Sequence, residues 1–267
     1  MQNNTSKITG VLHQQQSQQH YRLRRYFPDA CLADMIEQFW LVDWNLAESK
    51  THTQQNLPDP NFHLVINDEG ARIISPVSKV YAYEMKGEGK IIGVKFEIGA
   101  LDELLDLPLA SYVDKVIDAS KVFDADVVAE LSKLLNVNDD SAICQTLQAS
   151  LKPFATPVSE AQSVVRHLVR LMKEDSSLCK VTELAEHSGH SPRMLQRYFR
   201  TYVGLSPKWL IRKYRLHQAL EQLDSGHADI LDIVAQLEYT DQSHLIRDFK
   251  DVVGVTPRGY ELGSLKA

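Results

Sequence analysis

Apolar positions in the first hundred residues occur in short blocks separated by turn-forming residues, a pattern typical of β-strands. The most apolar and aromatic block runs from Met35 to Trp44 and predicts a buried strand. Four shorter blocks, bounded by residues such as Gly, Asp and Asn, predict further strands at 62–67, 72–74, 79–84 and 90–97. We therefore expect the N-terminal region to be rich in β-structure.

After residue 99 the apolar side chains recur three or four positions apart, which is the spacing of one face of a helix. The blocks 124–135 and 141–151 predict amphipathic helices that end the first domain. The segment 152–157 then carries two prolines, which disfavour a continuous helix and indicate a linker. A chain of 267 residues commonly folds as two domains. We expect these domains at residues 1–155 and 156–267.

The C-terminal half contains an internal repeat, because a shift of about 50 positions superimposes two segments without a gap. The superposition pairs residues of the same type: Ala185 with Ala235, Leu195 with Leu245, Arg197 with Arg247, Phe199 with Phe249, and Gly204 with Gly254. Each copy predicts a helix, a short break and a second helix that stops at the glycine. Ser191 and Asp241 supply the oxygen that caps each second helix. The repeat therefore predicts two helix-turn-helix units.

In each unit a leucine and a phenylalanine four positions apart fill the space between the helices, so the opposite face of the second helix points outward. Side chains that can contact bases or phosphates gather on these faces and on the helix between the units. The candidate DNA-binding residues are Arg193, Gln196, Arg197, Arg200, Lys208, Lys213, Gln242, Ser243, His244, Arg247 and Lys250. An alternative for Arg197 and Arg247 is a salt bridge within the domain.

The two units resemble a known family. The segments LAEHSGHSPRMLQRYFRTYVGLSPKWLIRKYRLHQAL and ILDIVAQLEYTDQSHLIRDFKDVVGVTPRGY are similar to the AraC/XylS transcription regulators. The resemblance implies seven helices, with two recognition helices in successive segments of the major groove. It assigns base contacts to Arg193, Gln196, Arg197, Gln242, Ser243 and Arg247. It also implies double-stranded DNA and RNA polymerase as partners.

The N-terminal half resembles the sensor domain of a subset of this family. The similarity lies in the motif Leu57-Pro58-Asp59 and in the motif Gly93-Val94-Lys95-Phe96. In several relatives this half is a cupin-like module for ligand binding or dimerisation. The expected fold is a two-domain α+β protein, with a β-rich N-terminal domain that carries added helices, followed by an all-α domain of two helix-turn-helix units joined by a helix.

The charge distribution narrows the kind of DNA binding that is expected. A formal net charge of −6 argues against a protein that coats nucleic acid without selection. The stretch from Arg193 to Arg215, however, contains seven Lys and Arg residues and no Asp or Glu. A basic run alone is usually a solvated helix face, and it is the repeat around this run that favours contact with DNA.

The sequence does not support a membrane protein, a secreted protein or an enzyme. No apolar run approaches the roughly 18 residues that span a bilayer, and the Gln-rich N-terminus lacks the apolar core of a signal peptide. The cysteines Cys31, Cys144 and Cys179 show no paired spacing and predict reduced thiols. We expect a cytoplasmic protein without membrane contact. Because no catalytic or nucleotide-binding motif occurs, we expect no enzymatic activity, no cofactor and no metal.

Aromatic residues in the predicted strands are the candidates for an effector site. The weak candidates for ligand binding are Trp40, Phe62, His63, Tyr83 and Phe96. The alternative is that they form the core of the domain. His52 and His63 offer a metal alternative that lacks the further ligands of a metal cupin. The helices predicted at 124–135 and 141–151 are candidates for the surface of a homodimer.

We therefore expect a sequence-specific DNA-binding regulator of transcription whose N-terminal domain senses an effector or mediates dimerisation. Two alternatives stay open: control by a protein partner in place of a small molecule, and a DNA-tethered enzyme. The resemblance favours an activator, but the sequence alone does not distinguish activation from repression. It identifies neither the effector, the operator nor the regulated genes.

Overall fold

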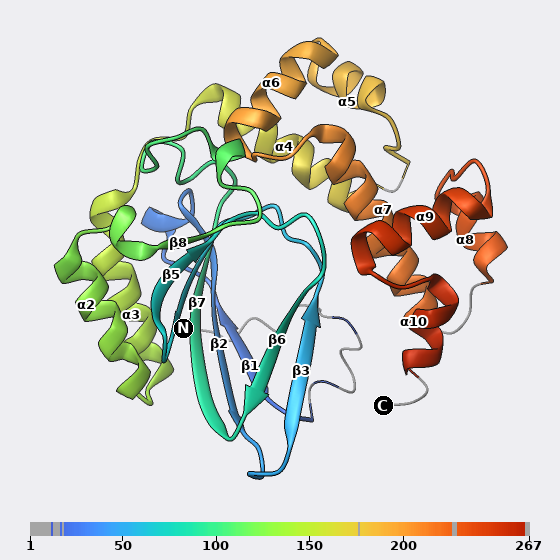
Figure 1. The fold of residues 1–267 in the computed structure, drawn as a ribbon. Coiled ribbons are helices and arrows are strands. Elements are labelled where there is room, and N and C mark those ends of the chain that lie inside the picture. The colour runs from blue at the N-terminus through green and yellow to red at the C-terminus, as the bar shows by residue number, and fades with distance from the viewer. Residues whose placement is uncertain (1–11, 13–16, 18, 176, 226–228, 265–267) are drawn as a thin grey trace.

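The computed structural model describes residues 12, 17, 19–175, 177–225 and 229–264. A β-rich N-terminal part is followed by an all-helical C-terminal part, which confirms the expected architecture (Figure 1). The helical part lies over one end of the sheets and continues down one side of them. The two halves of the chain are therefore in contact.

The N-terminal part contains two antiparallel sheets. The larger sheet has the strand order β1-β2-β7-β4-β5-β8, and β3 pairs with β6 in the smaller sheet. The strands are β1 (Arg22–Tyr26), β2 (Ile36–Asn45), β3 (Thr51–Asn56), β4 (His63–Asn67), β5 (Gly70–Ile74), β6 (Tyr81–Lys86), β7 (Glu88–Phe96) and β8 (Val116–Asp118). Strands β2, β4, β5, β6 and β7 overlap the predicted blocks, whereas β1, β3 and β8 have no counterpart among them.

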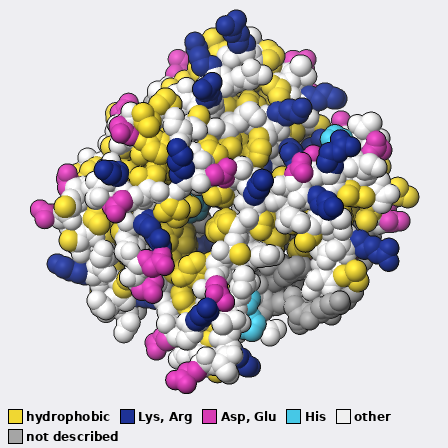
Figure 2. Space-filling model, in the orientation of Figure 1, with side chains coloured by type: hydrophobic (Ala, Val, Ile, Leu, Met, Phe, Trp, Pro, Cys, Tyr) yellow, Lys and Arg dark blue, Asp and Glu magenta, His cyan; other side chains and the backbone are white. Residues whose placement is uncertain are grey.

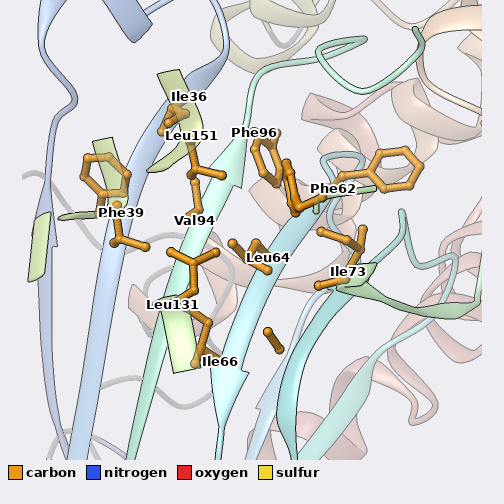
Figure 3. Packing of buried hydrophobic residues seen from close by; sticks show 14 of the residues in the cluster. Ile36, Phe39, Phe62, Leu64, Ile66, Ile73, Val94, Phe96, Leu131 and Leu151 are labelled. Atoms are coloured by element: carbon orange, nitrogen blue, oxygen red, sulfur yellow. The ribbon is translucent and has the colours of Figure 1, made fainter. Parts of the chain in front are cut away.

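The main core lies between the larger sheet and two helices, α2 (Ala125–Lys133) and α3 (Asp140–Leu151). Alternate side chains of a strand point to opposite faces, and the face toward the helices carries Phe39, Leu64 and Val94 (Figure 3). All three are fully buried. Helices α2 and α3 contribute Leu131 and Leu151 to the same core. Their apolar faces are thus covered by the sheet, so their amphipathic pattern no longer argues for a dimer surface.

Short 3-10 helices complete the N-terminal part. They are η1 (Ala30–Leu32), η2 (Leu109–Ser111), η3 (Ala119–Lys121), η4 (Leu134–Asn136) and η5 (Lys152–Phe154). Residues 100–107, where leucines at helical spacing were expected to continue a helix, form turns and bends instead.

The described part of the C-terminal domain contains seven α-helices, the number that the resemblance implies. They are α4 (Glu160–Glu174), α5 (Val181–Ser188), α6 (Pro192–Tyr202), α7 (Pro207–Ser225), α8 (Ile230–Gln236), α9 (Gln242–Val253) and α10 (Pro257–Ser264). The pairs α5–α6 and α8–α9 are the two helix-turn-helix units, and α7 connects them. Each unit has its own apolar cluster, around Phe199 in the first and Phe249 in the second. The predicted duplication is therefore confirmed.

The first unit is attached to the N-terminal part through α4 and α6. The side chain of Arg166 on α4 donates a hydrogen bond to the Ile98 carbonyl at 2.8 Å. Beyond the end of α6, Gly204 approaches η2 so closely that a Cβ at this glycine would lie 3.0 Å from the Leu109 carbonyl oxygen. Polar and backbone contacts thus fix this unit against the loops that follow β7.

The second unit is attached through α7 and α9. The Val80 N–H donates to the carbonyl oxygen of Val252, 2.9 Å away, near the C-terminus of α9. That carbonyl is one of the last four of the helix, which have no partner within the helix itself. Leu57 joins the apolar cluster that Leu216 and Leu220 of α7 form with α9. The N-terminal part therefore contacts both units independently.

Candidate nucleic-acid interface

The first helix-turn-helix unit presents one face of α6 to solvent. The Ser191 hydroxyl accepts a hydrogen bond from the Met194 N–H at 3.3 Å, which confirms the predicted cap. Leu195 and Phe199 are fully buried on the opposite side of the helix. The exposed positions follow the helical period and are Arg193, Gln196, Arg197 and Arg200. This first recognition face therefore carries three guanidinium groups and one amide.

The second unit repeats this arrangement on α9. The Asp241 carboxylate caps the helix by accepting a hydrogen bond from the His244 N–H at 2.8 Å. Leu245 and Phe249 are buried beneath the helix. The exposed positions are Gln242, Ser243, Arg247 and Lys250. This second recognition face is less basic than the first, because two of its four side chains are neutral.

The cations on both recognition faces are not paired with carboxylates of the described residues. Within the described part of the chain, Arg193, Arg197, Arg200, Arg247 and Lys250 form no salt bridge with any Asp or Glu. The alternative of intradomain salt bridges for Arg197 and Arg247 therefore finds no partner there. Figure 2 shows Lys and Arg side chains over α6 and near α8 and α9. These charges remain available to phosphate groups.

His244 lies at the edge of the second recognition face and also contacts side chains of its own unit. Its side chain is only partly exposed, and its ring lies edge-on against Tyr239 at a centroid distance of 5.2 Å. Its Nε2 atom lies 3.8 Å from a carboxylate oxygen of Asp248. With 40% of its side chain exposed, His244 stays a predicted DNA contact at the edge of the second recognition face.

Two arginines of α7 attach this helix to the second unit. Arg212 places Nε 3.0 Å from Oδ1 of Asp248 and a terminal nitrogen 2.9 Å from Oδ2 of Asp251. The guanidinium of Arg215 lies 3.9 Å above the ring of Tyr239. These basic residues therefore connect α7 to α8–α9, while Lys208 at the start of α7 stays exposed.

Lys213 points toward the N-terminal part, which corrects its prediction as a phosphate contact. Its ammonium lies 4.1 Å from the ring centre of Tyr214. Burial lowers the pKa of Lys213 to about 8, despite the favourable charge of Asp59 nearby. The sequence contains a signal for this orientation: Lys213 lies on the same side of α7 as Leu216 and Leu220, which pack against Leu57.

The candidate ligand residues divide between two apolar clusters. Phe62 and Phe96 are buried in the main core that α2 and α3 cover, which is the alternative that the sequence left open for them (Figure 3). Trp40 on β2 of the larger sheet and Tyr83 on β6 of the smaller sheet are partly exposed and pack around a separate apolar cluster.

The indole of Trp40 lies flat across the middle of the larger sheet, on the face away from α2 and α3. Trp40 on β2 and Val65 on β4 are both paired with Gly93 on β7. A Cβ at Gly93 would overlap the Trp40 ring, at 1.8 Å from its nearest atom, so glycine leaves the space that the ring occupies. The ring reaches His63, whose centroid is 6.3 Å away in an edge-on arrangement. Trp40 and His63 therefore lie together, as two of the five candidates.

Charged groups are concentrated where this face meets α7. Lys95 places its ammonium 3.1 Å from Asp59 and 3.2 Å from Glu37, and His63 lies 3.7 Å from Asp59. Burial works against the charge of Lys95, but Asp59 and Glu37 raise its pKa. Burial likewise opposes the Asp59 carboxylate, but Lys95 and His63 hold its pKa well below the usual value. Both residues are therefore charged at neutral pH.

These charged groups remain accessible to water, although protein surrounds them. The side chain of Asp59 keeps 30% of its exposure and that of Lys95 keeps 12%. Figure 2 shows hydrophobic side chains in a hollow at the place where Figure 1 shows β7 and β6 apart. Contacts between side chains define a cluster of Trp40, His63, Lys95, Asp59 and Lys213. Sequence reasoning missed Lys95, Asp59 and Lys213 as members, because only the packing of α7 on the sheet brings them together.

Metal and membrane sites find no support in the structure. No group of three or more His, Cys, Asp or Glu within the described ranges is arranged to hold a metal ion. Among the same residues, no helix is long and apolar enough to cross a membrane.

Two protein families match the chain. The first, described as a helix-turn-helix domain, matches residues 184–262, which include both recognition helices. The second, described as a domain of unknown function (DUF6597), matches residues 24–118, which include most of the two sheets.

Individual relatives match part of the chain. The HTH-type transcriptional activator AarP of Providencia stuartii is 31% identical over 80 residues, which are 30% of this chain and 59% of AarP. The F1 operon positive regulatory protein of Yersinia pestis is 33% identical over 103 residues, which are 38% of this chain and 34% of that protein. The match thus spans less than two thirds of either relative.

Among solved structures, ToxT of Vibrio cholerae matches with a TM-score of 0.40 and 12% identity, over 91% of this chain and 97% of ToxT. The helix-turn-helix match thus lies in the helical half of the chain, and the named relatives are regulators of transcription. Residues 184–262 therefore form a helix-turn-helix domain similar to those of known transcriptional activators.

Proposed function

We propose that this protein is a sequence-specific DNA-binding regulator of transcription that reads one duplex with both helix-turn-helix units. The observation that carries the proposal is the duplicated recognition helix. Each copy has a capped N-terminus, a buried leucine and phenylalanine, and an exposed face of cationic and amide side chains. Such a helix fits the major groove, where base edges present distinct patterns of donors and acceptors.

Roles within the two faces follow from side-chain chemistry. Arg193 and Arg197 have the fork of donors that pairs with guanine, and the amides of Gln196 and Gln242 pair with adenine. Arg247 takes the same role as Arg193 in the second unit. Ser243 completes the base-contacting set. The remaining exposed cations hold the DNA backbone: Arg200, Lys208 and Lys250.

The N-terminal domain regulates this binding through its contacts with both units. Ala110 of η2 lines a surface pocket together with Gln196 and Arg200 of the first recognition face. An effector that binds one arrangement of the domains more tightly than another shifts the population of the DNA-competent arrangement. RNA polymerase is the expected downstream partner, and a homodimer or a protein partner is the alternative to a small-molecule effector.

The DNA-tethered enzyme finds no observation in its favour. Its proposed nucleophile would be a cysteine, and burial raises the pKa of the Cys144 thiol to about 12. Burial also raises the pKa of Cys179. Thiols with raised pKa values are poor nucleophiles at neutral pH.

Selection of duplexes from a random pool by the purified protein tests the proposal. We expect an enriched site with two conserved segments about one helical turn apart, because each recognition helix occupies its own major-groove segment. Replacing Arg193 and Gln196 by Ala should relax base preference in one segment by about 1–3 kcal/mol per lost bidentate contact. Replacing Gln242 and Arg247 should relax the other segment. Enrichment of no sequence, or loss of preference in both segments from either pair, would refute two-unit readout.

Phosphate contacts give a second readout in the same experiment. Lys250→Gln should weaken all duplexes alike and make the dependence of log affinity on log salt shallower by about one unit. Lys133→Gln serves as the control, because Lys133 is exposed on α2, on the far side of the larger sheet. It should leave both the base preference and the salt dependence unchanged.

A further inference from the structure

The two helix-turn-helix units contact each other directly, in addition to their connection through α7. The thiol of Cys179, two residues before α5, donates a hydrogen bond to the Leu237 carbonyl at 3.9 Å. The ammonium of Lys180 lies 3.8 Å from Oε2 of Glu238. Leu237 and Glu238 begin the turn between α8 and α9. The start of the first unit therefore lies against the turn of the second.

The backbone of this turn has a conformation that is unusual for glutamate. Glu238 has a φ angle of 51°, in the left-handed region, and the equivalent turn of the first unit places Gly189 there with a φ angle of 66°. Glycine adopts this region readily, whereas a residue with a Cβ is strained in it. Such strain persists where neighbouring contacts hold the backbone in place. Here Lys180 attracts the Glu238 carboxylate, and the next residue, Tyr239, is buried.

Two arginines of α7 hold this turn and the recognition helix that follows it. Besides its contacts with the carboxylates of Asp248 and Asp251, Arg212 donates to the Asp248 carbonyl at 3.3 Å. The side chain of Asp248 is only 13% exposed, so solvent screens this ion pair less than a pair at the surface. The guanidinium of Arg215 lies over the ring of Tyr239 in the turn. The second unit is therefore fixed to α7 at two positions.

The first unit is fixed to the same part of α7. Leu210, Ile211 and Tyr214 are buried in the apolar cluster of that unit. These positions alternate along α7 with Arg212 and Arg215, so both units are held within about two turns of one helix. Little of α7 is left between the two attachments that could bend and let the units separate.

We propose that these contacts hold the two recognition helices at one fixed separation, so that the protein reads its two DNA segments at a single spacing. Arg212 and Glu238 are the positioning residues, and neither belongs to a recognition face. One added base pair moves the second segment by about 3.4 Å along the duplex and rotates it by about 35°. Two units with a fixed separation cannot follow this movement. The inference rests on the proposed function, because it concerns how two-unit readout is restricted.

Distance measurement in the full-length protein without DNA tests the fixed separation. Spin labels are coupled to a ketone-bearing amino acid in place of Arg193 and Ser243, which leaves the three cysteines unchanged. Pulsed electron paramagnetic resonance should give one narrow distance distribution for the labelled parent protein. Arg212→Met should broaden it at least twofold, because the ion pairs with α9 are lost. Glu238→Gly should also broaden it, because the carboxylate that faces Lys180 is lost.

A spacing series on DNA provides the second measurement. The selected duplex is altered by one or two base pairs between its segments, and we expect wild type to lose at least tenfold in affinity for a change of one. In Arg212→Met and Glu238→Gly the loss should be threefold or less, whereas a merely structural role would weaken all spacings by the same factor. Glu186→Gln is the control, because it removes an exposed carboxylate from α5 and should leave the tenfold loss unchanged.

Two results would overturn the inference. One is a distance distribution that is equally broad in the parent protein and in both variants, and the other is equal tolerance of wild type and variants to a changed spacing. Thermal unfolding shows whether each variant is folded, and Glu238→Gly should stay folded because glycine suits the left-handed turn. Since the distance measurement needs no DNA, failure of the duplex selection would remove two-unit readout without changing the measured separation.

Discussion

Lys213 shows how an enclosed charge can cost stability. Its ammonium is largely enclosed and has no close anion, and burial lowers its pKa from 10.5 to about 8. The folded protein therefore holds this proton less tightly than the unfolded chain does. Below pH 8 both states are protonated and the folded state bears the full penalty of the charge. Between pH 8 and 10.5 the folded protein has released the proton that the unfolded chain still holds, so stability rises with pH until the penalty is gone.

We predict that Lys213→Met stabilises the protein without ligand at pH 7 by about 1–3 kcal/mol, since a pKa difference of one unit corresponds to about 1.4 kcal/mol. The difference from wild type should shrink between pH 8 and pH 10.5. Urea unfolding of both proteins across this range provides the measurement. If the variant is less stable than wild type at pH 7, the attraction of Asp59 outweighs the cost of burying the Lys213 charge, which contradicts the prediction.

Individual site residues were predictable where local structure decides orientation. Helical period and caps placed Arg193, Gln196 and Arg247 on exposed faces, and the structure has them exposed. The orientation of Lys213 depends on contacts with the N-terminal part, which the helical period does not reveal. Phe62 lies in the main core, the alternative that the sequence left open, because alternation defines two faces of a strand but does not say which one helices will cover.

Among the helices, the two glycines that end α6 and α9 form a natural pair. Gly204 and Gly254 occupy equivalent positions of the repeat and have φ angles of 84° and 88°, in the left-handed region that favours glycine. Their surroundings differ. A Cβ at Gly204 would meet the Leu109 carbonyl of η2, whereas a Cβ at Gly254 would meet nothing within 4 Å. Gly204 therefore serves both as a helix stop and as a contact with the sensor domain.

We predict that Gly254→Ala destabilises the protein by about 1 kcal/mol, the usual cost of a left-handed alanine. Gly204→Ala should cost at least about 1 kcal/mol more, because η2 must also move. Guanidinium unfolding measures both values, with Gly254→Ala as the internal control. Equal losses in the two variants would mean that η2 does not restrain the end of α6.

Among the strands, apolar composition decided which were predictable. Strands β2 and β7 are largely buried and apolar, so their blocks were evident. Strand β3, with the sequence THTQQN, and the basic strand β1 lack that signal. Their strand conformation comes from pairing with β6 and β2, which are distant in the sequence. Backbone pairing does not require apolar side chains, and so it leaves little trace in the pattern.

The complete molecule depends on contacts that connect its two halves. Arg166 on α4 is one of them, since it donates to the Ile98 carbonyl and lies near Asp34. Gln162, one turn earlier, donates to the Gly99 carbonyl at 3.1 Å. The second unit has separate attachments at Val80 and Leu57. The N-terminal part thus restrains the relative orientation of the two recognition helices in addition to α7.

We predict that Arg166→Gln weakens docking of the first unit by about 1–3 kcal/mol, because a charge-assisted bond is lost and a partly enclosed carbonyl remains. Small-angle X-ray scattering should show a larger radius of gyration than for wild type. Arg170→Gln is the matched control, since Arg170 is exposed on the same helix and should leave the radius unchanged. If Arg166→Gln remains as compact as wild type, the other contacts are sufficient to hold the first unit against the N-terminal part.

Local regularities in the amino-acid order were enough to reveal the duplicated helix-turn-helix units, their caps and their outward faces, because helical period and capping act over a few neighbouring residues. The contacts that would couple the N-terminal part to the DNA-binding helices were decided by the packing of distant segments of the chain. The covered face of the sheet, the connection of Arg212 to Asp248 and the enclosure of Lys213 beside Asp59 all arise from partners many positions apart. Such partners leave no periodic signal, because their proximity results from the packing of the whole chain.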